Sequence, residues 1–245
     1  WKMNPRTLSE AEKLFSNTAK ALPALRKTEV VICPPYLYLE KLKSKSRKVI
    51  LGAQDAFWEE VGPFTGEVSA EMLYELGARY VILGHSECRK LGENDSTINK
   101  KVKGALAAGL TPILCVGEVE RDMNHEYINV VKKQIEVCLK GVGKNLLSKV
   151  IVAYEPVWAI SSTANRRDAT PEDSREMAIY LRKIISDLSS PEIANNTRIL
   201  YGGSADIKNA RGFLESGVDG LLPGRASLDP EKFAEIVKIC EALKS

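Results

Sequence analysis

The chain has 245 residues, of which 44% are hydrophobic and 27% charged, the composition of a folded globular protein rather than a disordered one. Its 35 basic and 32 acidic residues give a net charge of only +3, which argues against a dedicated nucleic-acid or membrane-surface protein. A solvated helix end and loop explain the densest basic stretch, residues 41–48. We therefore expect no nucleic-acid partner and no membrane association.

Short apolar runs alternate with amphipathic stretches along the chain. Apolar residues at helical spacing predict helices over 9–22, 96–108 and 126–139, the second of them capped by Asp95. Thr170 and Asp229, each followed by proline and acidic residues, mark the starts of two more helices. The apolar runs predict strands over residues 30–33, 49–51, 80–83, 112–115, 150–154, 198–201 and 220–222.

The predicted strands are apolar almost throughout, which suits strands of a parallel sheet that helices cover on both faces. Because the units repeat without a linker or a change of composition, we expect one α/β domain over residues 1–245. Periodicity alone leaves a closed barrel and an open doubly wound sheet both possible. The first strand lacks a following GxGxxG motif, which disfavours the open nucleotide-binding sheet. Since seven strands are one short of a barrel, we expect the chain to open, at Trp1–Asn4, at the end of strand one.

Cysteine and histidine usage limits the possible redox and metal chemistry. The five cysteines are odd in number and widely spaced, without a CxxC motif, so we expect reduced thiols in a cytoplasmic protein. With two histidines, His85 and His125, a histidine-rich metal site cannot be assembled, and we expect no metal or cofactor. His125 is expected to be a solvated loop residue. No apolar run approaches the roughly 18 residues that a membrane-spanning helix needs.

Chemically active residues stand where the predicted strands end, which is where barrel enzymes hold their active sites. Lys2, His85 and Glu155 supply an ammonium, an imidazole and a carboxylate. Two glycine-bearing turns follow later strands, at residues 201–204 and 223–227, and backbone N–H groups in such turns bind phosphate. This set suits proton abstraction next to the carbonyl group of a phosphorylated substrate.

Five motifs, in this order and at these separations, resemble the triosephosphate isomerase family. They are WKMN at 1–4, GHSE at 84–87, CVGE at 115–118, AYEPVWAI at 153–160 and YGGS at 201–204. The resemblance runs from Trp1 to the last helix and implies a closed (β/α)8 TIM barrel. It also implies interconversion of D-glyceraldehyde 3-phosphate and dihydroxyacetone phosphate through an enediolate.

The resemblance implies a role for each matching residue. Glu155 would be the base, His85 a neutral imidazole that polarises the carbonyl, and Lys2 the positive charge beside the enediolate. Glu87 would support Lys2, and Cys115 would be a buried packing residue beside the site. Pro156, Val157 and Trp158 match the first hinge of a lid that excludes water. Phosphate contacts would come from the backbone at Ser161, Ser204, Gly224 and Arg225.

A homodimer is also implied, because residues 57–67 resemble the family's interdigitating loop, with Thr65, Gly66 and Glu67 at the contact. Two positions and the lid tip depart from the family's usual pattern. Cys88 replaces an arginine that normally braces this loop, and Arg225 replaces a phosphate-loop glycine. The lid tip, residues 161–169, lacks both usual glycines and is three residues longer than usual.

Two alternatives remain open at this stage. The first is another phosphate-binding barrel enzyme, such as an aldolase, but its Schiff-base lysine is missing from the predicted strands. The second is a degenerate isomerase retained as a scaffold, which the altered lid favours and the presence of both His85 and Glu155 opposes.

Overall fold

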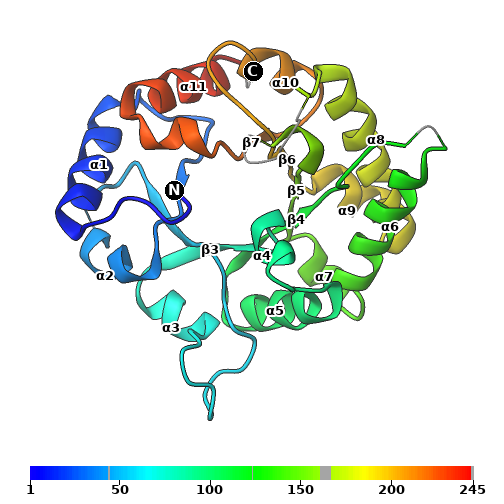
Figure 1. Ribbon diagram of the computed structural model, residues 1–245, viewed down its shortest axis with the longest axis horizontal. Coiled ribbons are helices and arrows are strands. Elements are labelled where there is room, and N and C mark those ends of the chain that lie inside the picture. Colours follow the sequence, from blue (N-terminus) through cyan, green and yellow to red (C-terminus); the bar gives the residue numbers. More distant parts are fainter. Residues whose placement is uncertain (44, 123, 161–166, 244–245) are drawn as a thin grey trace.

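The computed structural model describes residues 1–43, 45–122, 124–160 and 167–243 (Figure 1). Within that part of the chain, seven strands form one sheet, in sequence order and all parallel. The strands are β1 (Val31–Ile32), β2 (Ile50–Ala53), β3 (Ala78–Leu83), β4 (Thr111–Val116), β5 (Ile151–Tyr154), β6 (Ile199–Tyr201) and β7 (Gly220–Leu221). Each lies where the apolar runs predict a strand, so this part of the prediction is confirmed.

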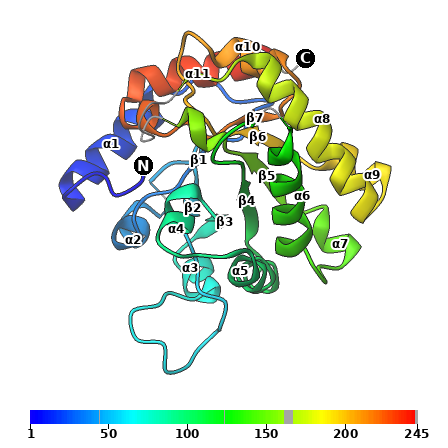
Figure 2. The ribbon, with the colours of Figure 1, turned by 45° about the vertical axis from the view of Figure 1, so that its right-hand side comes forward.

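Helices surround the curled sheet on its outer side, and α1 packs beside α11 (Figures 1 and 2). The longer helices are α1 (Leu8–Ala21), α5 (Asp95–Ala107), α6 (Glu126–Cys138), α8 (Pro171–Leu188) and α11 (Pro230–Leu243). The shorter ones are α2 (Leu39–Leu42), α3 (Ala70–Glu75), α4 (Ser86–Lys90), α7 (Lys144–Leu147), α9 (Pro191–Asn196) and α10 (Ala210–Glu215). Single 3-10 turns are η1 (Tyr36–Tyr38), η2 (Val157–Ala159) and η3 (Arg225–Leu228).

Side-chain alternation along the strands divides the core into two layers. Outward-facing residues such as Leu83, Leu114 and Val152 pack under the helices in the larger cluster. Inward-facing residues form a smaller cluster inside the curl, made of Tyr80, Ile113, Cys115, Ile151 and Ala153. The strands are therefore buried on both faces, which explains why they read as unbroken apolar runs.

The start of helix α5 corrects one detail of the sequence prediction. Asn94, not Asp95, is its N-cap, because the Asn94 side chain accepts a hydrogen bond from the Thr97 N–H at 3.0 Å. Asp95 instead pairs with Arg89 at 2.5 Å. The predicted cap at Thr170 is confirmed, since Thr170 and Asp173 form a reciprocal capping box at the start of α8.

Between β1 and β7 the sheet borders a cavity of about 560 Å³. Apolar residues of both strands line it, including Val31, Ile32 and Leu221. Lys2 and His85 line it as well. Strands β1 and β7 are not hydrogen-bonded to each other within the described residues, so the closed eight-stranded barrel is a finer claim than this sheet shows.

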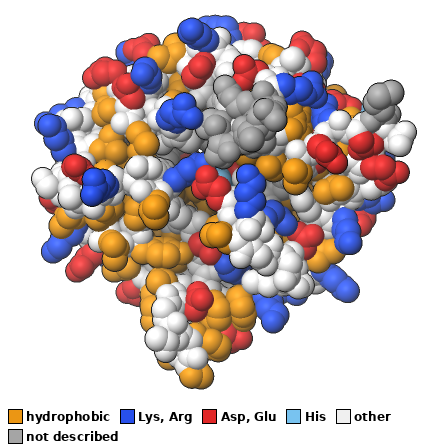
Figure 3. Space-filling view, in the orientation of Figure 1, with side chains coloured by type: hydrophobic (Ala, Val, Ile, Leu, Met, Phe, Trp, Pro, Cys, Tyr) orange, Lys and Arg blue, Asp and Glu red, His pale blue; other side chains and the backbone are white. Residues whose placement is uncertain are grey.

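A loop between β2 and α3, residues 57–68, projects away from the ring of helices (Figures 1 and 2). A bridge between Phe57 and Ser69 closes its base, and the ring of Phe64 packs against Phe57 with centroids 4.7 Å apart. Val61 is 84% exposed. We call residues 57–68 the projecting arm, and Figure 3 shows both hydrophobic and acidic side chains on it.

Candidate active site

Polar side chains gather beyond the carboxyl ends of the parallel strands. Glu155 directly follows β5, and His85 follows β3 after Gly84, whose φ of 71° gives the chain its turn. A side chain at Gly84 would also approach Ile98 to 2.9 Å. Because β3, β4 and β5 are neighbours and run the same way, these turns bring His85 and Glu155 together.

His85 and Glu155 are in direct contact. The His85 Nε2 atom lies 3.0 Å from Glu155 Oε1, and the Ser86 N–H donates to Glu155 Oε2 at 2.9 Å. His85 Nδ1 accepts a hydrogen bond from the Glu87 N–H at 3.1 Å, so in the neutral ring the proton is on Nε2. His85 therefore presents its Nε2–H, a hydrogen-bond donor, on the side that faces Glu155.

Burial changes the acidity of both groups. It raises the pKa of Glu155 to about 7, against the opposing effect of the Ser86 N–H. Burial, with the positive charge of Lys2 as a second cause, lowers the pKa of His85 to about 4. At neutral pH the imidazole is uncharged and the carboxyl group is close to its midpoint, so Glu155 can both accept and release a proton.

Lys2 enters the site from the start of the chain. Its Nζ lies 2.5 Å from Glu87 Oε1, and its backbone has a φ of 53°, in the left-handed region. Gln54 holds that backbone by donating to the Lys2 carbonyl at 2.8 Å. Burial is the largest single effect on Glu87 and opposes its ionisation. The hydrogen bond from Lys2 and the neighbouring positive charges, that of Lys2 first, together outweigh it, so the pKa of Glu87 falls below its usual value.

The two glycine-bearing turns predicted to bind phosphate, at residues 201–204 and 223–227, lie beside these groups. A side chain at Gly224 would stand 3.7 Å from Lys2 Cε, and one at Gly202 would stand 3.0 Å from Glu155 Cγ. Arg225 begins η3, and the Ser204 hydroxyl donates to the Ala159 carbonyl at 3.1 Å. Ser161, the remaining predicted phosphate contact, lies outside the described residues.

The segment after Glu155 is hydrogen-bonded to the residues that follow β4. Pro156, Val157 and Trp158 are buried, and the Val157 N–H donates to the Glu118 carbonyl at 3.0 Å. Gly117 is close-packed here, since a Cβ on it would lie 1.8 Å from the Glu155 carbonyl oxygen. Cys115 is fully buried, and burial raises the pKa of its thiol well above the usual value.

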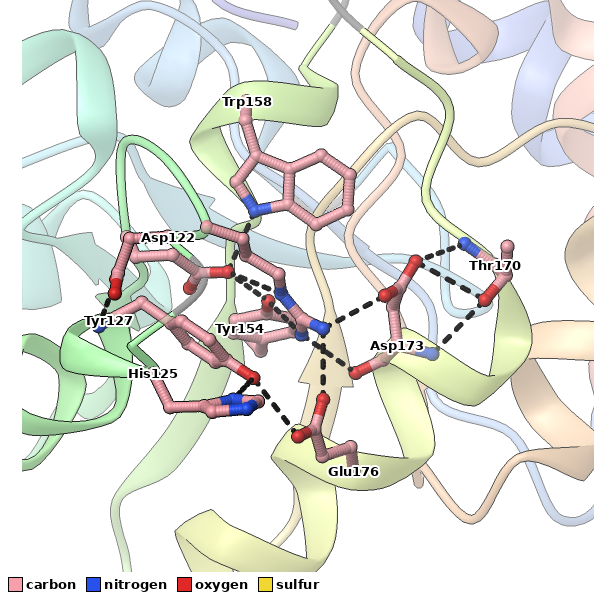
Figure 4. Close-up of polar contacts among 10 residues, drawn as sticks. Asp122, His125, Tyr127, Tyr154, Trp158, Thr170, Asp173 and Glu176 are labelled. Atoms are coloured by element: carbon pink, nitrogen blue, oxygen red, sulfur yellow. Dashed lines mark hydrogen bonds and ion pairs between the residues drawn. The ribbon is translucent and has the colours of Figure 1, made fainter.

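A polar cluster beside Trp158 contains residues that sequence reasoning did not assign (Figure 4). Glu118 is 1% exposed, and its Oε1 accepts from Trp158 Nε1 and the Tyr154 hydroxyl, each at 2.7 Å. Arg121 contacts Glu118 and also Asp173, 52 residues further along the chain. Glu118 stands within the CVGE motif, which could have marked it as a residue of the site. No motif identifies Arg121, because its partners on α8 are distant in sequence.

Cys88 and the base of the projecting arm lie next to a cluster of charges. Cys88 is half-buried, and burial, with Asp55 and Glu93 as further causes, raises the pKa of its thiol to about 11. Lys101 pairs with both of these acids, with a hydrogen bond to Asp55 at 2.8 Å and an ion pair with Glu93. His125 is exposed, as expected, at the N-cap of α6.

Within the described residues, no group of three or more His, Cys, Asp or Glu side chains could hold a metal ion. In the same part of the chain, none of the helices combines the length and apolar character needed to cross a bilayer.

A parallel α/β sheet with a carboxylate, a neutral imidazole and an ammonium at its carboxyl edge defines an enzyme class whose chemistry is proton transfer. Comparisons with known proteins specify the family. The family profile described as triosephosphate isomerase matches residues 1–240. Over 243 residues the chain is 44% identical to the curated triosephosphate isomerase of Aquifex aeolicus (strain VF5), covering 97% of this chain and 96% of that protein.

Over 245 residues it is likewise 44% identical to the triosephosphate isomerase of Caldanaerobacter subterraneus subsp. tengcongensis, again covering 97% of this chain and 96% of the relative. The chain belongs to the triosephosphate isomerase family, which confirms the resemblance that the five motifs carry.

Proposed function

We propose that this chain interconverts D-glyceraldehyde 3-phosphate and dihydroxyacetone phosphate, a step of glycolysis and gluconeogenesis, with Glu155 as the catalytic base. The contact between His85 Nε2 and Glu155 Oε1, at 3.0 Å, carries the proposal. It places a proton acceptor and a neutral N–H donor side by side in one site, as the transfer of a proton between adjacent carbons requires.

In the proposed reaction, the Glu155 carboxylate removes a proton from the carbon beside the carbonyl, and the C–H electron pair becomes the enediolate double bond. The carbonyl oxygen gains negative charge, which the His85 Nε2–H stabilises as a hydrogen-bond donor. Glu155 then returns its proton to the neighbouring carbon, while His85 moves a proton between the two oxygens. No electrons leave the substrate, so the reaction needs no redox cofactor.

Lys2 and the glycine-bearing turns supply the remaining roles. The Lys2 ammonium favours the enediolate and the phosphate, and Glu87 fixes its position through their ion pair. Backbone groups at Ser161, Ser204, Gly224 and Arg225 would hold the phosphate. Pro156, Val157 and Trp158 would be the hinge of the lid, and the buried Cys115 would support the site by packing.

We propose that residues 1–245 form one domain, that the sheet belongs to a closed (β/α)8 barrel, and that the protein is a cytoplasmic homodimer. The family membership supports the barrel and the dimer. The projecting arm also supports the dimer, because its apolar residues, such as Val61, are exposed in a single chain. In the dimer, Thr65, Gly66 and Glu67 would contact the second copy.

The test is an assay of triose phosphate interconversion by the purified chain and by Glu155→Gln. The variant keeps the size of the side chain but cannot accept the proton, so we expect kcat to fall by about 10³-fold or more. Glu172→Gln, on the exposed first turn of α8, is the matched control and should keep full activity. A Glu155→Gln protein that is as active as the parent would refute the proposed base.

A further inference from the structure

Arg121 lies between the two ends of the segment that joins β5 to α8. On one side its Nε donates to Glu118 Oε1 at 3.2 Å, and the same oxygen accepts from Trp158 Nε1 at 2.7 Å. On the other side its Nη1 donates to Asp173 Oδ1 at 2.8 Å and to Glu176 Oε2 at 2.9 Å. Figure 4 shows Trp158 on one side of this cluster and Asp173 and Glu176 on the other.

The guanidinium has no spare donor in this position. Its Nη2 contacts the Tyr154 hydroxyl and the Asp173 carbonyl, each at 3.3 Å, so five N–H groups meet five acceptors. The side chain is 11% exposed, and without it three carboxylates, one of them nearly fully buried, would lie together with like charge.

Ring contacts reinforce the link between the two ends of the segment. The Arg121 guanidinium lies 5.4 Å from the centroid of the Trp158 ring and 4.8 Å from that of Tyr127. Arg167, at the far end of the segment, lies 4.1 Å from the same Trp158 ring. Trp158 is therefore held by both Arg121 and Arg167.

The position of Trp158 bears on the position of the base. Glu155 stands three residues before Trp158 in the sequence. Pro156 and the single turn of η2 occupy the interval and leave few free backbone torsions. A displacement of Trp158 would therefore be transmitted to the Glu155 carboxylate, which must stay within hydrogen-bonding reach of both the substrate and His85.

We infer that Arg121 is a positioning residue for the isomerisation: by joining Glu118 and Trp158 to Asp173 and Glu176, its guanidinium holds both ends of the segment after Glu155 and so fixes the catalytic base. This inference rests on the proposed role of Glu155. It predicts that Arg121 affects turnover more than substrate affinity, because the residue touches no group proposed to bind the phosphate.

The primary test compares Arg121→Gln with Arg182→Gln. Arg182 is also an α8-anchored, ion-paired arginine, contacting Asp219 at 2.8 Å and the Thr197 carbonyl at 3.0 Å, but it lies away from Trp158 and the base. For Arg121→Gln we expect kcat to fall on the order of tenfold with less than about a threefold change in KM. Arg182→Gln should keep kcat within about twofold of the parent.

Two further variants separate positioning from a merely structural role. Arg121→Lys keeps the charge but lacks the planar fork, so it should recover less than half of the lost log kcat. It also serves as the test protein if Arg121→Gln does not fold. In Trp158→Phe, which removes the indole N–H, adding Arg121→Gln should lower kcat less than it does in the parent, because both changes break one linkage.

The inference is overturned if Arg121→Gln keeps the parental kcat or if Arg121→Lys has the full parental kcat. It is also overturned if the effects of Arg121→Gln and Trp158→Phe on log kcat simply add. The Glu155→Gln protein is assayed alongside. If that protein is active, the proposed base is wrong whatever Arg121 does, so the two failures are distinguishable.

Discussion

The buried carboxyl group of Glu155 makes the stability of the fold depend on pH. Glu155 is fully enclosed and has a pKa of about 7, whereas an unfolded chain would ionise it near the ordinary value of 4.5. Between these two values the folded protein holds a proton that the unfolded chain has released. Stability from this group is therefore complete below about pH 4.5 and is lost as the pH rises through 7.

Glu155→Gln should remove this pH dependence. We expect the variant's free energy of unfolding, relative to the parent's, to rise by on the order of 2 kcal/mol between pH 5.5 and 8, since a pKa difference of one unit corresponds to about 1.4 kcal/mol. Denaturant titrations at several pH values measure it. The exposed-site variant Glu172→Gln should show no such trend, and a flat difference for Glu155→Gln would mean that burial does not raise the pKa of Glu155.

Gly117 is required by close packing rather than by its backbone conformation. Since an added Cβ would lie 1.8 Å from the Glu155 carbonyl oxygen, Gly117→Ala must displace the backbone that carries Glu155, the proposed base. We expect a loss of about 2 kcal/mol or more in unfolding free energy, together with reduced kcat. Gly143→Ala, where no atom lies within 4 Å of an added Cβ, should change stability by less than about 1 kcal/mol. If Gly117→Ala and Gly143→Ala lowered stability equally in thermal or denaturant unfolding, close packing would not be the reason for glycine at position 117.

At the scale of the elements, the strands could be read from the sequence and many helices could not. Strands buried on both faces leave unbroken apolar runs, which is why all seven were found. Short helices such as α3, α7 and α9 have four to six residues, too few for a helical period to show. The cap of α5 was misplaced by one residue because Asn94 and Asp95 are both good capping residues. Sequence spacing does not reveal that Asp95 is hydrogen-bonded to Arg89 instead.

The corrected cap of α5 can be tested directly. Asn94→Ala should lower the free energy of unfolding by about 1 kcal/mol, because the Thr97 N–H loses its acceptor. Ser96→Ala removes only a hydroxyl that donates to the same Asn94 side chain and should change stability by less than about 0.5 kcal/mol. Equilibrium denaturation of the two variants compares them, and a larger effect for Ser96→Ala would contradict the assignment of Asn94 as the cap.

At the scale of the molecule, the motifs predicted which residues meet, but not how they are held. His85 and Glu155 were expected to share a site from their places at strand ends, and their contact follows from parallel neighbouring strands. The contacts of Arg121 could not be predicted, because its partners Asp173 and Glu176 lie on α8, 52 and 55 residues further along the chain. The dimer and the closed barrel stay predictions, since the structure holds one copy of the chain and its described residues form a sheet of seven strands.

The projecting arm provides a test of the proposed dimer. Val61→Asp places a charge on an 84% exposed apolar position of the arm and should shift the protein from dimer to monomer. Ile179→Asp, at a 63% exposed position on the outer surface of α8, should leave the assembly unchanged. Analytical ultracentrifugation over a concentration series measures both. If Val61→Asp sediments as the parent does, the arm is not part of a dimer contact.

The carboxyl group of Glu155 also affects the heat of ligand binding. With a pKa of about 7, roughly half of the molecules carry a proton at this position in neutral solution. Any ligand that prefers one of the two forms must exchange protons with the solvent as it binds. The calorimetric enthalpy of binding an enediolate mimic should therefore differ between buffers of different ionisation heat. The slope of that dependence counts all protons exchanged on binding, and its difference from the slope for Glu155→Gln gives the part that belongs to Glu155.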